Sequence, residues 1–362
     1  MSFYRIIRPI LFLFSPETSH RMVIGMLKRL GRVPLFCSIV RGAFNVNAPE
    51  LEREVFGIKF KNPVGVAAGL DKNGECFNGL SDFGFSFVEI GSVTPKPQLG
   101  NPKPRVFRLV KDNALINRMG INNKGVRAVV NSLMEHKHRT IVAGSLSKNS
   151  ETSNESAPKD FENTFAILYD FVDFFVLNIS CPNVKDLEKL QDIDALTKIV
   201  DRLMSLRLFY DDYKPILLKV SPDIEKEQLD QILNLVLTTG LDGIVATNTT
   251  KDRPQSLKSD PEDIAEIGKG GLSGEPLFER SLGLVKYINE KTGGLVPIIA
   301  SGGIMTPKNA KDMLDAGASL VEVYTGFIYE GPGFCRRILK YLKQCSQHQS
   351  APSAMKSSSD KS

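Results

Sequence analysis

Eight short apolar runs recur through most of the chain, and this repetition constrains the fold more than any other feature of the sequence. Each run has the length and the β-branched residues of a buried strand, and most runs are separated by longer amphipathic segments. The runs span residues 64–68, 87–91, 141–146, 174–179, 216–220, 243–247, 298–302 and 320–324. Eight parallel strands alternating with helices form a closed barrel, so the sequence predicts an α/β protein with the (β/α)8 TIM-barrel fold.

The segments between the runs show the spacing expected of helices that cover such a barrel. We expect these helices at residues 125–135, 193–208, 226–238, 278–291 and 307–316. Residues 148–160 and 251–276 are polar and contain Gly or Pro, so we interpret them as insertions between the barrel elements.

The first 45 residues differ from the rest in charge and in pattern. They contain seven basic residues and one acidic residue, a net charge of +6, whereas the remaining residues sum to −1. Residues 3–14 are mostly apolar, and Ser15-Pro16-Glu17 predicts the start of a second short helix. A basic arm of two amphipathic helices is typical of a contact with an anionic membrane surface, since a spanning helix needs about 20 apolar residues.

The sequence therefore predicts three parts: an arm at residues 1–45, a barrel at 46–345 and a disordered tail rich in Ser and Lys at 346–362. The five cysteines include no C-x-x-C pair and the four histidines are scattered, so neither a disulfide framework nor a metal site is expected. A reducing cytosol fits this cysteine usage best. The nearly neutral body argues against a nucleic-acid partner.

Polar residues follow the apolar runs at the positions where the strands should end. In a (β/α)8 barrel the carboxyl ends of the strands form the active site, so these residues are the candidates for chemistry. They are Lys72, Ser92, Ser145, Asn178, Cys181, Asn183, Lys219, Thr247, Asn248, Gly302, Gly303, Tyr324 and Thr325. Each of them alone is also compatible with a solvated strand end. Lys219 is the exception, because a lysine inside an apolar strand is seldom buried unless it is paired with an anionic group.

The last two runs end in glycine-containing turns that favour a phosphate site. Gly302 and Gly303 precede a helix whose first turn is marked by Thr306-Pro307. A second glycine-containing turn of this kind is Tyr324-Thr325-Gly326. Backbone N–H groups at helix N-termini bind phosphates, although two tight turns would give the same pattern. Lys219 and the amides of Asn117 and Asn178 favour a flavin over a sugar phosphate, because a reduced flavin ring has an anionic edge.

Nine motifs, in the same order along the chain, resemble those of the class 2 dihydroorotate dehydrogenases, which are quinone-dependent and membrane-associated. The motifs are AAGLDKNGE, VEIGSVTPKPQLGNPKPRVFRL, INRMGINNKG, NISCPN, LKVSPD, ATNTT, GGLSGEPL, ASGGI and EVYTGFIYEGP. The resemblance covers about residues 1–342 and includes the basic arm. It implies oxidation of (S)-dihydroorotate to orotate in pyrimidine (UMP) synthesis, with bound FMN as cofactor and a membrane quinone as acceptor. It also implies a peripheral protein on the cytoplasmic face of the cell inner membrane, without an obligate protein partner.

The resemblance assigns roles to particular residues. The flavin contacts would be Ala68, Gly69, Lys72, Ser92, Ser145, Asn178, Lys219, Thr247, Gly274, Gly303, Tyr324 and Thr325. Dihydroorotate would be bound by Lys72, Asn117, Arg118, Met119, Gly120, Ile121, Asn178, Asn183, Asn248 and Thr249. The quinone would lie near His20, Arg108 and Tyr324, and Cys181 would be the catalytic base that takes a proton from carbon five. For His20, a purely structural role in the arm is an equal alternative.

Two residues depart from the family pattern. Cys181 stands where the quinone-dependent class usually has serine, and cysteine is typical of the soluble class 1 enzymes. Ser145 replaces an asparagine at the end of the third strand, which leaves one flavin or substrate hydrogen bond to be made by water.

Three other functions remain open at the level of the sequence. The nearest is a class 1 dihydroorotate dehydrogenase that uses fumarate or a partner subunit as acceptor, which Cys181 supports and the arm opposes. The second is a phosphate-binding barrel lyase or isomerase without flavin. The third is a non-catalytic membrane-surface protein with a degenerate barrel.

Overall fold

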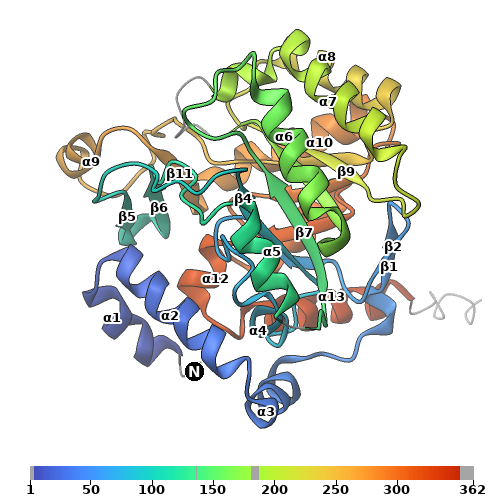
Figure 1. The fold of residues 1–362 in the computed structure, drawn as a ribbon. Helices are drawn as coiled ribbons and strands as arrows, with labels where there is room; N and C mark the ends of the chain where they lie inside the picture. Colours follow the sequence, from blue (N-terminus) through green and yellow to red (C-terminus); the bar gives the residue numbers. More distant parts are fainter. Residues whose placement is uncertain (1–3, 136, 181–186, 351–362) are drawn as a thin grey trace, which may run out of the picture.

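A closed barrel of eight parallel strands forms the centre of the molecule (Figure 1). The structure, a computed structural model, describes residues 4–135, 137–180 and 187–350. The barrel strands follow one another in chain order around the barrel: β3 (Val64–Val66), β4 (Phe87–Val93), β7 (Ile141–Leu146), β8 (Phe174–Asn178), β9 (Ile216–Val220), β10 (Gly243–Ala246), β12 (Ile298–Ser301) and β13 (Leu320–Val323). Every predicted run contributes one of these strands, so the predicted TIM barrel is confirmed.

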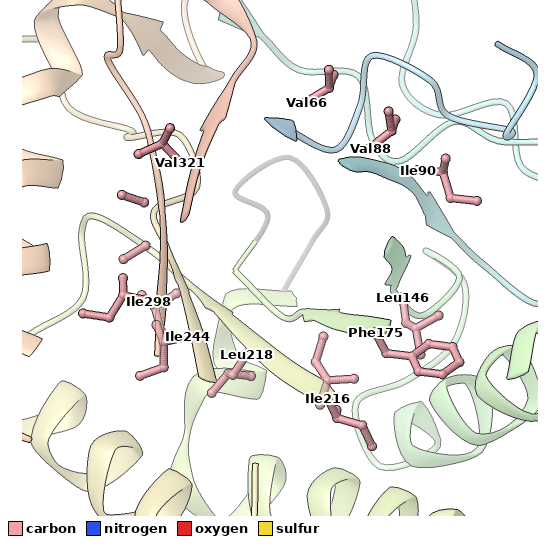
Figure 2. Packing of buried hydrophobic residues seen from close by; sticks show 14 of the residues in the cluster. Val66, Val88, Ile90, Leu146, Phe175, Ile216, Leu218, Ile244, Ile298 and Val321 are labelled. Atoms are coloured by element: carbon pink, nitrogen blue, oxygen red, sulfur yellow. The ribbon is translucent and has the colours of Figure 1, made fainter. Parts of the chain in front are cut away.

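Helices surround the barrel and bury the outward-facing side chains of its strands. They are α4 (Phe77–Ser81), α5 (Val126–Met134), α6 (Ala157–Leu168), α7 (Ile193–Arg207), α8 (Lys226–Thr239), α10 (Phe278–Lys291), α11 (Pro307–Asp315), α12 (Thr325–Glu330) and α13 (Phe334–Ser350). Figure 2 shows outward-facing residues such as Val88, Ile90 and Phe175, which are fully buried in the largest apolar cluster. Because successive strand residues point to opposite faces, the residues between them point into the barrel.

The inward-facing residues form two layers of different chemistry. The layer at the amino ends of the strands is apolar, and a hairpin of β1 (Arg53–Val55) and β2 (Ile58–Phe60) closes it from below. The Phe60 ring packs edge-on against Phe87, with ring centroids 5.4 Å apart. Two residues further along β4, the inward position is the buried Glu89. The polar layer therefore begins halfway up the barrel and opens at the carboxyl ends of the strands.

The arm contains three helices, whereas the sequence predicted two. Helices α1 (Tyr4–Leu13) and α2 (Pro16–Leu30) are followed by α3 (Pro34–Phe44). Pro34 occupies the first turn of α3, where a missing N–H breaks no helical hydrogen bond. Helices α1 and α2 pack beside α12 and the strand β5 (Val106–Leu109) (Figure 1). No helix within the described ranges has the length and apolar content needed to span a bilayer.

The structure adds detail to one expected insertion and corrects the expected start of the tail. The insertion at 251–276 contains α9 (Pro261–Ile267) and the strand β11 (Gly271–Gly274), which pairs with β6 (Ala114–Asn117) and through it with β5. Helix α13 continues to Ser350, past the residue at which the disordered tail was expected to begin. Leu342 and Ile338 anchor this helix in the core, and the helix extends from that anchor into the polar segment.

Candidate active site

A cavity of about 1130 Å³, measured out to its solvent mouth, lies at the carboxyl ends of the barrel strands. Most of the predicted flavin and substrate residues line it. They are Ala68, Gly69, Lys72, Ser92, Asn117, Met119, Gly120, Ile121, Asn178, Lys219, Thr247, Asn248, Thr249, Gly274, Gly303, Tyr324 and Thr325. These residues lie in or just after seven of the barrel strands and in the β6 and β11 segments, so barrel closure brings together positions far apart in the sequence.

Four other predicted residues, among those that the structure describes, do not line this cavity. Ser145 lies behind its wall, and Arg118 turns away toward α9, where its guanidinium donates to the backbone oxygens of Ile267 and Lys269. His20 and Arg108 lie in a second cavity. Cys181 and Asn183 fall outside the described residues.

A chain of hydrogen bonds fixes the amides at one wall of the cavity. The Asn178 amide nitrogen donates to the Ser92 hydroxyl at 2.7 Å, and the Asn248 amide nitrogen donates to Asn178 Oδ1 at 3.2 Å. Ser145 supports this chain from behind, with its hydroxyl 3.1 Å from that of Ser92. Ser145 therefore contributes to the site by orienting Ser92, which is itself held against Asn178.

Lys219 lies in the cavity lining and is buried together with two glutamates that were not among the predicted site residues. Its ammonium lies 3.0 Å from Glu89 Oε2 and 3.7 Å from Glu322 Oε2. Burial lowers the pKa of Lys219, but the two carboxyl groups outweigh this and leave its pKa raised. The signal was present in the sequence, because Glu89 and Glu322 each interrupt an apolar strand just as Lys219 does.

Burial lowers the pKa of a lysine but raises the pKa of a carboxylic acid, so its effect on Glu322 is the reverse of its effect on Lys219. Loss of solvent raises the pKa of Glu322 well above its usual value, and the neighbouring Glu89 carboxylate raises it further. Among the described residues, neither carboxyl oxygen of Glu322 has a hydrogen-bond partner. Burial and the lack of donors both favour the neutral form of a carboxyl group.

Glycine turns at the end of the cavity bring the backbone close to any ligand. Gly303 has φ +76°, and an added Cβ there would lie 2.3 Å from the Phe278 backbone. Gly302 through Met305 line the cavity, but the first turn of α11 does not. The Thr306 side chain instead caps α11 through a reciprocal bond with Asn309. Of the two parts of the predicted phosphate motif, the glycine turn therefore lines the cavity and the first turn of α11 does not.

A second cavity of about 1270 Å³ lies between the arm and the barrel, and its lining is mostly apolar. Residues of α1 and α2, such as Leu11, Phe12 and Val23, form one side of it. Four residues line both cavities: Val106, Leu115, Met119 and Tyr324. The polar and the apolar cavity thus share a wall one side chain thick.

His20 lies in the lining of the second cavity, beside the loop that carries Lys72. Its Nε2 lies 2.8 Å from the Leu70 carbonyl oxygen. Burial lowers the pKa of His20 and the Lys72 ammonium lowers it further, so the ring is neutral near pH 7. In a neutral ring the nitrogen beside a carbonyl must carry the proton, so Nε2 is the donor.

Ion pairs attach the arm to the barrel beside this cavity. Arg105, 6% exposed, binds both carboxylate oxygens of Glu17 at 2.8 and 3.2 Å. Arg108 donates to the Phe14 carbonyl at 2.7 Å and to the Ser19 hydroxyl at 3.0 Å. The sequence patterns alone did not predict that either arginine contacts the arm. In the part of the chain that the structure describes, no group of His, Cys, Asp or Glu residues could hold a metal ion.

A closed barrel with a polar cavity at its strand ends is the architecture of the (β/α)8-barrel enzymes. Comparison with known proteins identifies the family. The family model for dihydroorotate dehydrogenase matches residues 50–345. A curated "Dihydroorotate dehydrogenase (quinone)" of Christiangramia forsetii is 47% identical, covering 92% of this chain and 96% of the relative. One of Coxiella burnetii is 43% identical, covering 94% and 96%. The chain belongs to the dihydroorotate dehydrogenase family.

Solved structures agree with this assignment. A crystal structure of DHODH from Eimeria tenella in complex with ferulenol superposes with a TM-score of 0.84 at 36% identity, covering 92% of each chain. The ligand-free form from the same organism also gives a TM-score of 0.84, at 37% identity, covering 92% of this chain and 96% of that one.

Proposed function

We propose that this protein oxidises (S)-dihydroorotate to orotate with bound FMN and passes the electrons to a membrane quinone, as a step in UMP synthesis. The observation that carries the proposal is the pair of cavities with a common wall. A charged, planar substrate fits a cavity lined by amides and a lysine, whereas a quinone fits an apolar one. Electron transfer between them needs a carrier at the common wall.

The residues at the strand ends suit FMN as that carrier. When bound, FMN supplies a two-electron acceptor that can be reoxidised at a separate site. Lys219, Thr247 and the Asn178 amide offer hydrogen-bonding groups to a flavin ring, and the Gly302–Met305 turn with Gly326 suits its phosphate. The buried, unpartnered Glu322 in the lining also indicates that this cavity is built for a polar ligand.

Dihydroorotate would be bound by one cation and several amides. We assign its carboxylate to Lys72 and the Asn117–Ile121 segment, and its ring edges to the side chains of Asn178 and Asn248. Asn183 completes this set in the proposal, although it lies outside the described residues. Arg118 contributes by holding the loop, because its side chain is bound to the α9 segment.

Cys181 is the proposed general base, in the segment outside the described residues. Its thiolate accepts the proton from carbon five while hydride leaves carbon six, which oxidises the bond between the two carbons. Asn178 and Lys219 are fixed independently of it, so they hold the ligands whether or not the thiolate is present.

The arm supplies the quinone site and the membrane contact. His20 and Tyr324 lie in the lining of the apolar cavity, and Arg108 secures the arm residues that cover it. Exposed apolar residues, among them Leu13 (84%) and Leu35 (72%), accompany the basic residues Arg5, Arg21 and Arg29 on the arm. We place the protein peripherally on the cytoplasmic face of the inner membrane, with residues 1–45 as the contact and 46–345 as the catalytic barrel.

The apolar cavity and the quinone-dependent relatives favour this class over the class 1 alternative. The test is an acceptor assay with purified protein. Dihydroorotate should bleach a flavin absorption band, and a quinone should restore the colour, whereas fumarate and NAD should not. A colourless protein that binds no FMN would overturn the cofactor assignment, and reoxidation by fumarate alone would support class 1.

A further inference from the structure

The buried cluster of Glu89, Lys219 and Glu322 has one more carboxyl group than it has cations. All three side chains point into the barrel, from β4, β9 and β13. Each is at most 7% exposed. Two ionised carboxylates with a single ammonium would leave a net negative charge in a site of low dielectric, which is strongly unfavourable. One of the two carboxyl groups must therefore be protonated.

The hydrogen bonds of Glu89 and Glu322 indicate which of the two carboxyl groups is protonated. Glu89 Oε2 accepts from the Lys219 ammonium at 3.0 Å and from the Ala68 N–H at 3.4 Å. Glu322 lies further from the ammonium, at 3.7 Å, and within the described residues it accepts no hydrogen bond. Hydrogen-bond donors stabilise the anion, so Glu89 is the ionised group and Glu322 is the acid.

Within residues 4–135, 137–180 and 187–350, no further ionisable group acts on Glu322 to offset this charge. The strands on either side of β13 place Ser301 and Gly65 opposite Glu322 in the sheet register. The titratable groups that act on it are Glu89 and Lys219. Lys72 and Tyr324 also line the cavity; burial raises the pKa of Tyr324 to about 12, so its hydroxyl stays neutral.

We propose that Glu322 is a neutral carboxylic acid that keeps the Lys219 cluster uncharged beneath the flavin site, and that it acts on the flavin as a positioning residue through Lys219. This inference rests on the proposed binding of FMN. With Glu322 protonated, the ammonium is shared with one carboxylate only. Ionisation of Glu322 would add one negative charge to the floor of the cavity and weaken the hold of Lys219 on an electron-rich ring.

The proton on Glu322 can be observed in the wild-type protein. Infrared spectra of holoprotein containing ¹³C-labelled glutamate should show the carbonyl stretch of a protonated glutamic acid at pH 7. The label separates this band from that of the buried Asp71, whose pKa is also raised by burial. The band should be absent in Glu322→Gln and present in the matched control Glu54→Gln, an exposed glutamate on β1. Absence of the band from the wild-type protein would overturn the proposal.

Flavin binding then tests which glutamate is neutral and whether it acts through Lys219. Glutamine mimics a neutral acid, so Glu322→Gln should keep the FMN dissociation constant within about threefold at pH 7. Glu89→Gln removes the carboxylate that accepts from both the Lys219 ammonium and the Ala68 N–H, so the cation loses its fixed position and FMN binding should weaken by at least about tenfold. The reverse order of effects would overturn the assignment.

A pH series upward from pH 7 gives a further readout. As pH rises through the raised pKa of Glu322, FMN binding by the wild-type protein and by Glu54→Gln should weaken, while Glu322→Gln should not follow them. Identical pH profiles for all three proteins would contradict a role through Lys219. If neither the wild-type protein nor any variant bound FMN, the proposed cofactor would be wrong, but the infrared band, recorded on the purified protein without FMN, would still decide the state of Glu322.

Discussion

Lys219 shows how a single charge is accommodated inside the barrel. Its ammonium is 3.0 Å from Glu89, so the buried charge is paired. Removal of the cation would leave Glu89 as an unpaired buried anion, which normally destabilises a protein by about 3–5 kcal/mol. The lysine is thus needed for stability as well as for ligand binding.

We therefore expect Lys219→Met to weaken FMN binding and to lower the free energy of unfolding by about 3 kcal/mol. Urea unfolding and FMN titration measure the two effects. Lys111→Met, at an exposed position, should change neither. A Lys219→Met protein with wild-type stability and flavin content would contradict both roles.

At Cys181 the expected effect is on chemistry and not on binding. Replacement by alanine removes a proton acceptor and should slow flavin bleaching by dihydroorotate about 10² to 10⁴-fold, with unchanged FMN content. Serine should retain partial activity with a pH optimum shifted upward, because a hydroxyl is less acidic than a thiol, whose pKa is about 8.5. Anaerobic stopped-flow traces from about pH 6 to 10 measure this. Bleaching by the alanine variant at close to the wild-type rate would assign the proton to another group.

At the scale of elements, helix α2 depends on one buried ion pair for its position on the barrel. Glu17 and Arg105 are 15% and 6% exposed, whereas Arg32 and Glu135, which also join arm to barrel, are each 49% exposed. Burial raises the pKa of Glu17, but the hydrogen bonds and charge of Arg105 outweigh it and lower its pKa overall. The contribution of Glu17 to stability is therefore present above its unfolded pKa of about 4.3 and is lost as pH falls through the lower folded value.

Glu17→Gln should lower the free energy of unfolding near pH 7 by about 2 kcal/mol, because a charged hydrogen-bond pair is lost. Arg32→Gln should cost less than about 1 kcal/mol, as expected for an exposed pair. Denaturant unfolding at pH 7 and again near pH 3 measures the difference. The Glu17→Gln defect should shrink at the lower pH, and a defect that did not change would exclude the ion pair as its cause.

The outer face of the arm is expected to control membrane binding. Changing Leu13, Leu35 and Ile39 to serine removes exposed apolar area without touching the lining of either cavity. Binding to vesicles of anionic lipid, measured by sedimentation, should fall, with the flavin half-reaction unchanged. The matched triple variant Leu208, Phe209 and Tyr213 to serine, on an exposed patch of the barrel, should bind vesicles as the wild type does. Equal losses in both variants would show that the arm is not the contact.

At the scale of the whole molecule, the two cavities separate the two halves of the proposed reaction. Val23 lines only the apolar cavity, so Val23→Trp should fill part of it and leave the polar cavity intact. We expect reoxidation by quinone to slow at least about tenfold, equivalent to 1.4 kcal/mol of lost binding, while bleaching by dihydroorotate stays normal. Val33→Trp, at an exposed arm position, is the control. Parallel loss of both half-reactions would contradict two separate cavities.

The sequence by itself determined the barrel and the edge at which its site lies. Strand periodicity and helical spacing are local properties, so the eight apolar runs predicted the strands, and the polar residues after them predicted the cavity. Several motifs also carried the family resemblance. The third arm helix was missed because Pro34 was not read as a helix start.

Only the tertiary structure decided which side chains meet. Glu89, Lys219 and Glu322 are separated by more than a hundred residues from one another and become partners because barrel closure turns all three inward. Arg118 leaves the cavity because α9 offers carbonyl oxygens on its other side, and Ser145 supports Ser92 from behind the wall. The periodicity of a strand determines which face a residue takes, whereas its partner across the barrel depends on the closure of all eight strands.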